Sequence, residues 1–150
     1  MIDVFSQPSR KNKWAFAVVL LAVVIVLADV ALVAWIGAPA PLMAIMAFVL
    51  ATVLVVAYGF ATMRFSFGNG VFTAKFFPFS YDVRAKDFVK VELLSSTPWW
   101  VGWGVRAWGR TLYFIGDHGP AVAISKKSGF FRKVVFTPVD AKEFHKQLRK

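Results

Sequence analysis

The chain has 150 residues, of which 58% are hydrophobic, and its 18 Lys and Arg exceed its eight Asp and Glu to give a net charge of +10. This apolar share is above that of an ordinary soluble domain and is gathered in two runs, which excludes a disordered chain and argues against a purely soluble protein. With no cysteine and only two histidines, the chain has no disulfides, thiolate nucleophiles or cysteine-based zinc sites, and no cofactor is expected.

A short basic tail, residues 1–13, precedes two apolar runs that cover residues 14–36 and 41–63. A helix over either run would be about 34 Å long, enough to cross a hydrocarbon core about 30 Å thick. The Gly- and Pro-rich link between the runs allows only a tight antiparallel hairpin. The sequence therefore predicts a two-helix transmembrane hairpin over residues 14–63.

Two alternatives compete with this interpretation. A buried helical hairpin of a soluble protein would not need such long apolar runs. A cleaved signal peptide has a hydrophobic region of about 7–15 residues, and here the first run is longer and a second run follows at once. Both alternatives are therefore disfavoured.

The charges that flank the hairpin predict its orientation. Arg10, Lys11 and Lys13 precede the first run, Arg64 follows the second, and the link between the runs carries no charge. The positive-inside rule therefore predicts a multi-pass protein of the plasma membrane with both termini in the cytoplasm. Residues 64–150 carry 15 Lys and Arg against six Asp and Glu, a net charge of +9. This charge suits an anionic inner leaflet, and it is equally typical of cytoplasmic flanks in general.

Residues 64–150 are predicted to form a strand-rich cytoplasmic domain. Short runs of β-branched and aromatic residues alternate with turn signals, of which Asn69-Gly70 is the strongest. The predicted strands are Arg64–Phe67, Val71–Phe77, Phe79–Arg84, Phe88–Leu94, Val105–Trp108, Thr111–Ile115, Ala121–Ser125 and Phe131–Phe136. Their short links favour antiparallel pairing.

The last segment is predicted to be an amphipathic helix. Thr137 is expected to cap it, Pro138 to occupy its first turn, and Val139 or Ala141 with Phe144 and Leu148 to form one apolar stripe. The predicted fold class is therefore a membrane α-helical hairpin plus an α+β domain. That domain is an antiparallel β-barrel or sandwich of about seven strands closed by the C-terminal helix.

This arrangement resembles the bacterial pleckstrin-homology-like (bPH) membrane proteins. The resemblance is carried by the two spans and by an ending in which Gly129, Val135, Phe136, Pro138, Asp140, Phe144 and Leu148 stand at the family's spacing. The segments Phe88–Leu93 and Ala121–Ile124 resemble two strands of the family. The resemblance implies a PH-like barrel with a C-terminal helix, and it implies no single biochemical activity.

Asp29 is the most unusual residue of the hairpin, because an ionisable group inside a span costs about 2.5–3.5 kcal/mol on insertion scales. It is a candidate for assembly with another subunit or, less favoured, for proton relay. It could also be a protonated or water-reached residue that is merely tolerated. In an antiparallel hairpin, Thr52 would lie about one turn from its level.

Two segments of the domain are candidate contact sites. Trp99, Trp100 and Trp103 lie in a run broken by Gly and Pro, which predicts a loop that either exposes them to a partner or membrane interface or folds them into the core. The second segment is a basic turn with two phenylalanines, which either meets anionic lipid or is a solvated turn with Phe131 in the core. Its candidate lipid-contact residues are Lys126, Lys127, Phe130, Phe131, Arg132 and Lys133.

No catalytic motif is found: His118 lies in a Gly/Pro turn beside Asp117, and His145 lies on the C-terminal helix. The sequence therefore predicts a non-enzymatic, membrane-anchored interaction module, a small subunit or scaffold of a membrane protein complex. The alternative is a module that binds anionic lipid or the membrane surface. The expected partners are membrane lipid and other membrane protein subunits or further copies of the chain, and nucleic acid is disfavoured because no nucleic-acid-binding motif is present.

Overall fold

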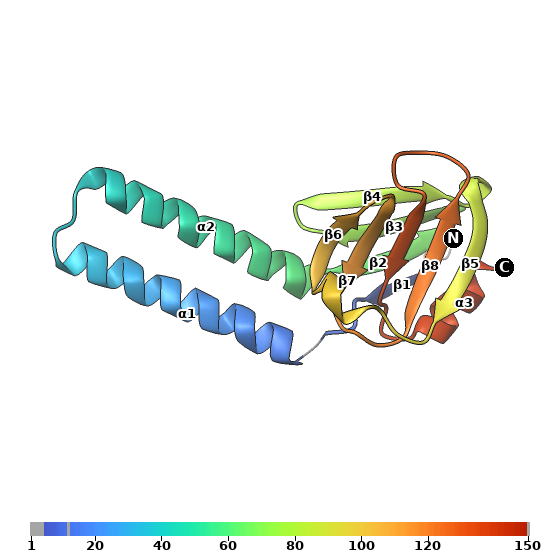
Figure 1. Ribbon diagram of the computed structural model, residues 1–150, viewed down its shortest axis with the longest axis horizontal. Coiled ribbons are helices and arrows are strands. Elements are labelled where there is room, and N and C mark those ends of the chain that lie inside the picture. The colour runs from blue at the N-terminus through green and yellow to red at the C-terminus, as the bar shows by residue number, and fades with distance from the viewer. Residues whose placement is uncertain (1–4, 12, 150) are drawn as a thin grey trace.

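The computed structural model describes residues 5–11 and 13–149, so parts of the predicted tail and the last residue, residues 1–4, 12 and 150, lie outside the described residues. Two long helices project from one end of a sheet-rich domain and lie side by side (Figure 1). They are α1 (Lys13–Trp35) and α2 (Ala40–Thr62), each 23 residues long. Their bounds fall within one residue of the predicted runs.

Both helices are long and apolar enough to cross a membrane. None of the residues in their most apolar windows is buried within the molecule, so a core helix of a soluble protein does not describe them. The turn between them uses Gly37, whose φ of +64° suits a residue without Cβ, and Pro39, which precedes the first turn of α2. The predicted antiparallel hairpin is therefore present.

The domain contains two sheets, and neither closes into a barrel. The first has the order β1 (Phe5–Pro8), β2 (Arg64–Gly68), β3 (Val71–Phe76) and β4 (Phe79–Arg84). The second has the order β5 (Phe88–Leu94), β8 (Ala121–Lys126), β9 (Lys133–Phe136), β7 (Thr111–Ile115) and β6 (Gly104–Trp108). Short 3₁₀ turns, η1 (Ala85–Asp87) and η2 (Trp99–Val101), precede β5 and β6. Of the predicted barrel or sandwich, the two-layered arrangement of a sandwich describes the domain.

The core lies between the two sheets and is built from phenylalanine rings. Phe72 of β3 stacks on Phe136 of β9 with ring centroids 4.4 Å apart, and Phe65 of β2 lies 5.0 Å from the same ring. The C-terminal helix α3 (Ala141–Leu148) adds Phe144, which lies 5.3 Å from Phe136 and is fully buried. The helix thus fills the core with its apolar face, as the stripe of residues predicted.

The N-terminal tail forms a strand, which the sequence analysis missed. β1 pairs antiparallel with β2, and the half-buried Phe5 contacts Phe144 edge to face at 5.3 Å. Ser9 N–H donates to the Met63 carbonyl at 2.9 Å. The tail and the domain therefore form one folded unit at the base of the hairpin, although more than 50 residues separate them in sequence.

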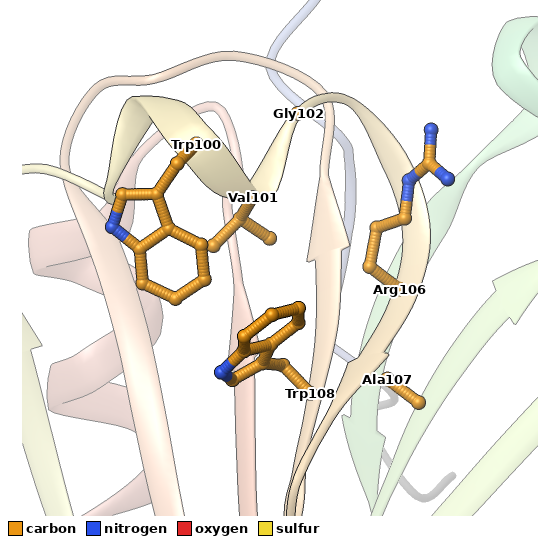
Figure 2. A pocket seen from close by; sticks show the side chains of 6 residues that line it. All are labelled: Trp100, Val101, Gly102, Arg106, Ala107 and Trp108. Atoms are coloured by element: carbon orange, nitrogen blue, oxygen red, sulfur yellow. The ribbon is translucent and has the colours of Figure 1, made fainter.

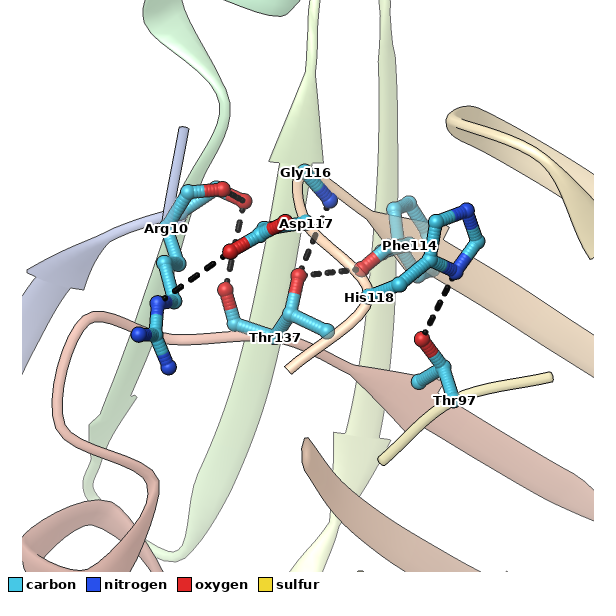
Figure 3. Close-up of polar contacts among 8 residues, drawn as sticks. Arg10, Thr97, Phe114, Gly116, Asp117, His118 and Thr137 are labelled. Atoms are coloured by element: carbon cyan, nitrogen blue, oxygen red, sulfur yellow. Dashed lines mark hydrogen bonds and ion pairs between the residues drawn. The ribbon is translucent and has the colours of Figure 1, made fainter. Parts of the chain in front are cut away.

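The strands pair mostly antiparallel, as predicted, but β9 lies between β7 and β8 and pairs parallel with β7. The predicted start of the C-terminal helix is wrong, because α3 begins at Ala141 and Pro138 lies before it. Thr137 does not cap α3: the cap is Asp140, whose Oδ1 accepts from the Glu143 N–H at 2.9 Å. Thr137 is instead fully buried. Its Oγ1 accepts a hydrogen bond from the Gly116 N–H at 2.9 Å, which fixes the loop after β7 (Figure 3). Val139, the alternative first residue of the stripe, is exposed.

Candidate interaction surface

The loop between β5 and β6 brings its indoles to the surface. Trp99 is 82% exposed and Trp100 is 50% exposed, both on the short turn η2. Gly102 and Gly104 have φ of +72° and +92°, which lets the chain turn sharply out of η2 into β6. Two of the three predicted tryptophans are therefore exposed, as one of the two alternatives required.

A further tryptophan that the sequence analysis did not single out completes this surface. Trp108, the last residue of β6, is 68% exposed, and its ring lies edge to face with Trp100 at 5.5 Å. Alternation along β6 could have found it: Val105 packs against the core, so Arg106 and Trp108 point the other way. We call Trp99, Trp100 and Trp108 the tryptophan patch.

A cavity of about 440 Å³ opens beside the patch. It is lined by Trp100, Val101, Gly102, Arg106, Ala107 and Trp108. Figure 2 shows the two indoles facing each other, with the Arg106 side chain extended away from them. An exposed aromatic surface with a neighbouring arginine has the composition of the central part of a protein interface.

Trp103, the third predicted tryptophan, has a different position. It is half-buried, and its ring lies 5.9 Å from His118. Its Nε1 is buried and has no hydrogen-bond partner among the described residues. Trp103 is therefore neither exposed like Trp99 nor part of the core between the sheets.

The two histidines are held by structural contacts. Nδ1 of His118 lies 3.1 Å from Oγ1 of the buried Thr97, which joins two loops (Figure 3). In the same loop as His118, Asp117 pairs with the Arg10 guanidinium of the tail at 3.3 Å. His145 Nε2 lies 3.2 Å from the Val91 carbonyl. Among the described residues there is no group of three or more His, Asp or Glu that could hold a metal ion.

The basic turn between β8 and β9 is stabilised by internal contacts. Lys126 Nζ donates to Tyr81 Oη at 2.6 Å and lies 4.9 Å from the centre of that ring. Arg132 donates to the Lys127 carbonyl, and Lys133 lies 3.8 Å from Glu92. The neighbouring Lys90 lies 2.5 Å from Glu92, and this hydrogen bond and its positive charge lower the pKa of the carboxyl, with Lys133 adding to the effect.

The two phenylalanines of this turn differ in exposure. Phe130 is 79% exposed, whereas Phe131 is half-buried against Tyr81 at 6.1 Å. Figure 1 shows the orange loop after β8 at the side of the domain, away from the end that meets α1 and α2. Lipid contact through Phe130 stays a prediction. Three of the cationic residues predicted to contact lipid beside it already form contacts within the protein, namely Lys126, Arg132 and Lys133.

The two candidate residues of the hairpin, Asp29 and Thr52, form no hydrogen bond with each other in the part of the chain that the structure describes. Asp29 is exposed on α1, and no hydrogen bond or ion pair of its side chain is found within residues 5–11 and 13–149. Thr52 is exposed on α2, and its hydroxyl donates to the Phe48 carbonyl one turn earlier at 2.9 Å. Asp29 therefore faces outward from the hairpin, where another chain or lipid would meet it.

The chain was compared with protein-family models, curated proteins and solved structures, and none of them matches it.

Proposed function

We propose that the chain is a membrane-anchored interaction module, a small subunit or scaffold of a membrane protein complex. In this proposal, α1 and α2 cross the plasma membrane, and the domain and both chain ends lie in the cytoplasm. The basic flanks and the uncharged turn between the helices support this orientation.

The proposal also includes a PH-like character for the domain. Two packed sheets followed by a helix whose apolar face enters the core support it, together with the residue pattern from Gly129 to Leu148. The parallel pairing of β7 with β9 departs from the antiparallel pairing that the short links predict. The resemblance assigns no activity, so the function must be argued from the surface.

The tryptophan patch carries the proposal. Exposed indoles are costly in water and are enriched where proteins bind one another. Trp108 stands on a strand of the sheet and Trp100 packs on it, so the patch is fixed before a partner arrives. The strand also begins beside the membrane hairpin, because Gly104 lies against Phe60 of α2. A partner on this surface would therefore be held close to the bilayer.

Site-specific photo-crosslinking tests this function in the full-length protein. A photoreactive residue in place of Trp99 is expected to capture one defined protein or a second copy of the chain. The same residue in place of Val89, exposed on β5, is the control and is expected to capture little. Trp108→Ser should abolish the capture, and Trp35→Ser, a change at an exposed tryptophan of α1, should preserve it. Equal capture from positions 89 and 99 would contradict the proposal.

Asp29 provides a second contact in this proposal, within the membrane. A carboxyl group that faces outward from the hairpin is expected to pair with a polar or cationic group of a neighbouring subunit. Asp29→Asn should weaken an assembly that survives mild detergent, whereas Thr52→Val should leave it intact because Thr52 bonds its own helix. If native gels show the complex unchanged by Asp29→Asn, Asp29 has no assembly role.

The alternative function is binding to an anionic membrane surface, and the exposed Phe130 between cationic residues favours it. The chain has no cysteine, so one introduced cysteine labels one position only. A polarity-sensitive fluorophore on Phe130→Cys should shift to shorter wavelength in nanodiscs of anionic lipid if this function holds, with Val89→Cys as the control. An unchanged spectrum leaves the interaction module as the function.

A further inference from the structure

A second groove lies where α2 meets the domain. It has a volume of about 460 Å³, and its walls come from α2, from β3 and β4, and from β6 with the residue before it. The residues that matter here are Val56 and Phe60 of α2, Phe76 and Phe79 of the β3–β4 hairpin, and Trp103 and Arg106. Figure 1 shows β6 next to the C-terminal end of α2. We call this cavity the interfacial groove.

The groove is held open by close packing of the β3–β4 hairpin on α2. Gly59 is the buried residue of α2, and a Cβ on it would lie 2.6 Å from the Phe77 carbonyl oxygen. Tyr58 lies edge to face with Phe77 at 5.2 Å, and Phe60 with Phe76 at 5.6 Å. These contacts fix the β3–β4 hairpin against the last turns of α2, so the walls of the groove are positioned by packing within the protein.

The helix wall of the groove reaches membrane depth. Val56 stands six residues before the end of α2, which is about 9 Å along the helix axis, and it is exposed. If α2 spans the bilayer, Val56 lies in the hydrocarbon and Phe60 lies near its boundary. Phe79, the first residue of β4, also lines the groove and is 66% exposed. An acyl chain in the groove would contact both apolar side chains.

The groove also has a cationic side chain in its lining. Arg106 is exposed, and no carboxylate partner for its guanidinium is found in the part of the chain that the structure describes. It stands two residues, about 6.6 Å of strand, beyond Gly104, which lies against Phe60. A guanidinium binds the oxygens of a phosphate group in a two-pronged geometry. The apolar walls and the cation therefore provide the two kinds of contact that a phospholipid makes, one for an acyl chain and one for a phosphate.

We propose that the interfacial groove binds one anionic phospholipid, with an acyl chain against Val56 and Phe79 and the phosphate on Arg106. This inference rests on the proposed insertion of α1 and α2 into the membrane. The groove is separate from the basic turn, and the residue that it shares with the cavity beside the tryptophan patch is Arg106. The site would couple the position of the domain to the lipid composition of the adjoining bilayer, because the β3–β4 hairpin and β6 would both contact the bound lipid.

Native mass spectrometry of the full-length protein in neutral detergent tests the proposal. Palmitoyl-oleoyl phosphatidylglycerol is titrated against palmitoyl-oleoyl phosphatidylcholine, and the chain is expected to take up one phosphatidylglycerol in preference. Arg106→Gln should weaken this first binding event by about tenfold, the loss expected for one charge-assisted contact. Arg84→Gln removes an exposed charge outside the groove and should leave the binding unchanged. Equal binding by the Arg106 variant and the Arg84 variant would overturn the proposal.

A second pair of variants tests the acyl-chain part of the groove. Val56→Trp fills the groove and should abolish the preferred binding. Val55→Trp adds the same volume at the neighbouring exposed position, which does not line the groove, and should preserve it. Equal loss in both variants would overturn the groove as the lipid site. A protein that leaves the complex in Val56→Trp alone, with no preferred lipid in the wild type, would assign the groove to a protein partner and overturn it too.

Extraction of cell membranes with alkaline carbonate separates this inference from the membrane insertion on which it rests. A chain that stays in the membrane but shows no preference for phosphatidylglycerol contradicts the lipid site alone. A chain that carbonate releases contradicts the insertion of the helices and, with it, the site.

Discussion

Gly59 of α2 and Phe77 of the β3–β4 hairpin approach so closely that a single added carbon cannot be placed between them, since a Cβ on Gly59 would lie 2.6 Å from the Phe77 carbonyl oxygen. The aromatic ring of Phe76 would lie 2.8 Å from the same carbon. Helix α2 and the domain are therefore joined by direct packing as well as by the chain at Met63.

Because of this contact, replacing Gly59 by alanine should have the opposite effect on stability from the same change in an exposed helix. In an exposed helix, Gly→Ala stabilises by about 1 kcal/mol. Here Gly59→Ala should destabilise the protein by about 1–3 kcal/mol, because the backbone of the β3–β4 hairpin must move away from the added Cβ. Thermal unfolding of the protein in detergent measures the change, with Ala61→Val as a control at an exposed position of the same helix. A raised melting temperature in Gly59→Ala would show that the β3–β4 hairpin does not pack on α2.

The strand β1 should be needed for a stable domain. Phe5 is half-buried against Phe144, so Phe5→Ala is expected to lower the free energy of unfolding by about 1–3 kcal/mol, less than a fully buried ring would cost. Ser6→Ala, at an exposed position of the same strand, should change it little. Chemical denaturation followed by tryptophan fluorescence measures both. Equal stability of the two variants would show that the tail does not belong to the fold.

The hydroxyl of Thr137 should stabilise the loop after β7. Thr137→Val keeps the shape of the side chain but leaves the Gly116 N–H without its acceptor in a buried site. Such a loss costs about 1–3 kcal/mol. Thr73→Val, at a half-buried position of β3, is the control. Faster amide hydrogen exchange at Gly116 in the Thr137 variant alone would support the assignment, and unchanged exchange would contradict it.

The helices and most strands could be predicted because their signals are local. Two apolar runs of 23 residues give the hairpin directly. Asn69 and Gly70 have φ of +54° and +69°, the values that a two-residue turn between β2 and β3 requires. β1 gave no such signal, because four residues become a strand only through their pairing with β2, far along the chain. The parallel position of β9 is likewise set by its neighbours in the sheet.

The tryptophan patch could likewise be predicted only in part, because the exposure of each side chain depends on contacts with distant parts of the chain. The run of tryptophans predicts an unusual loop, but whether each indole is exposed depends on what packs beneath it. Trp103 is half-buried beside His118, whereas Trp99, four residues earlier, is 82% exposed. Arg106 looks like any strand cation in the sequence, because its groove is formed by α2 and by β3 and β4. A site built from three distant segments has no local pattern to find.

Glu92 should make a small, pH-dependent contribution to stability. Its pKa is lowered mainly by Lys90, which donates a hydrogen bond and supplies positive charge, and Lys133 adds to the effect. A lowered pKa in the folded state means that the charged carboxylate favours folding above its ordinary pKa, and that this stabilisation is lost as the pH falls through the lowered value. Wild type and Glu92→Gln should therefore differ in melting temperature at neutral pH and converge in acid. Because the Glu92 side chain is 32% exposed to solvent, added salt should reduce the difference. A difference that grows in acid would contradict this assignment.

The pairing of β1 with β2 makes the orientation of the protein in the membrane testable at two positions, one in the turn between the helices and one in the domain. The tail before α1 and the domain after α2 form one unit, so both lie on the same side of any membrane that α1 and α2 cross. The positive flanks predict that this side is the cytoplasm. Ala40→Cys, at the turn between the helices, should react with a membrane-impermeant maleimide added to intact cells. Ser128→Cys, exposed in the domain, should react only after the membrane is opened. The reverse labelling pattern would place the domain outside the cell, and labelling of both positions in intact cells would contradict a spanning hairpin altogether.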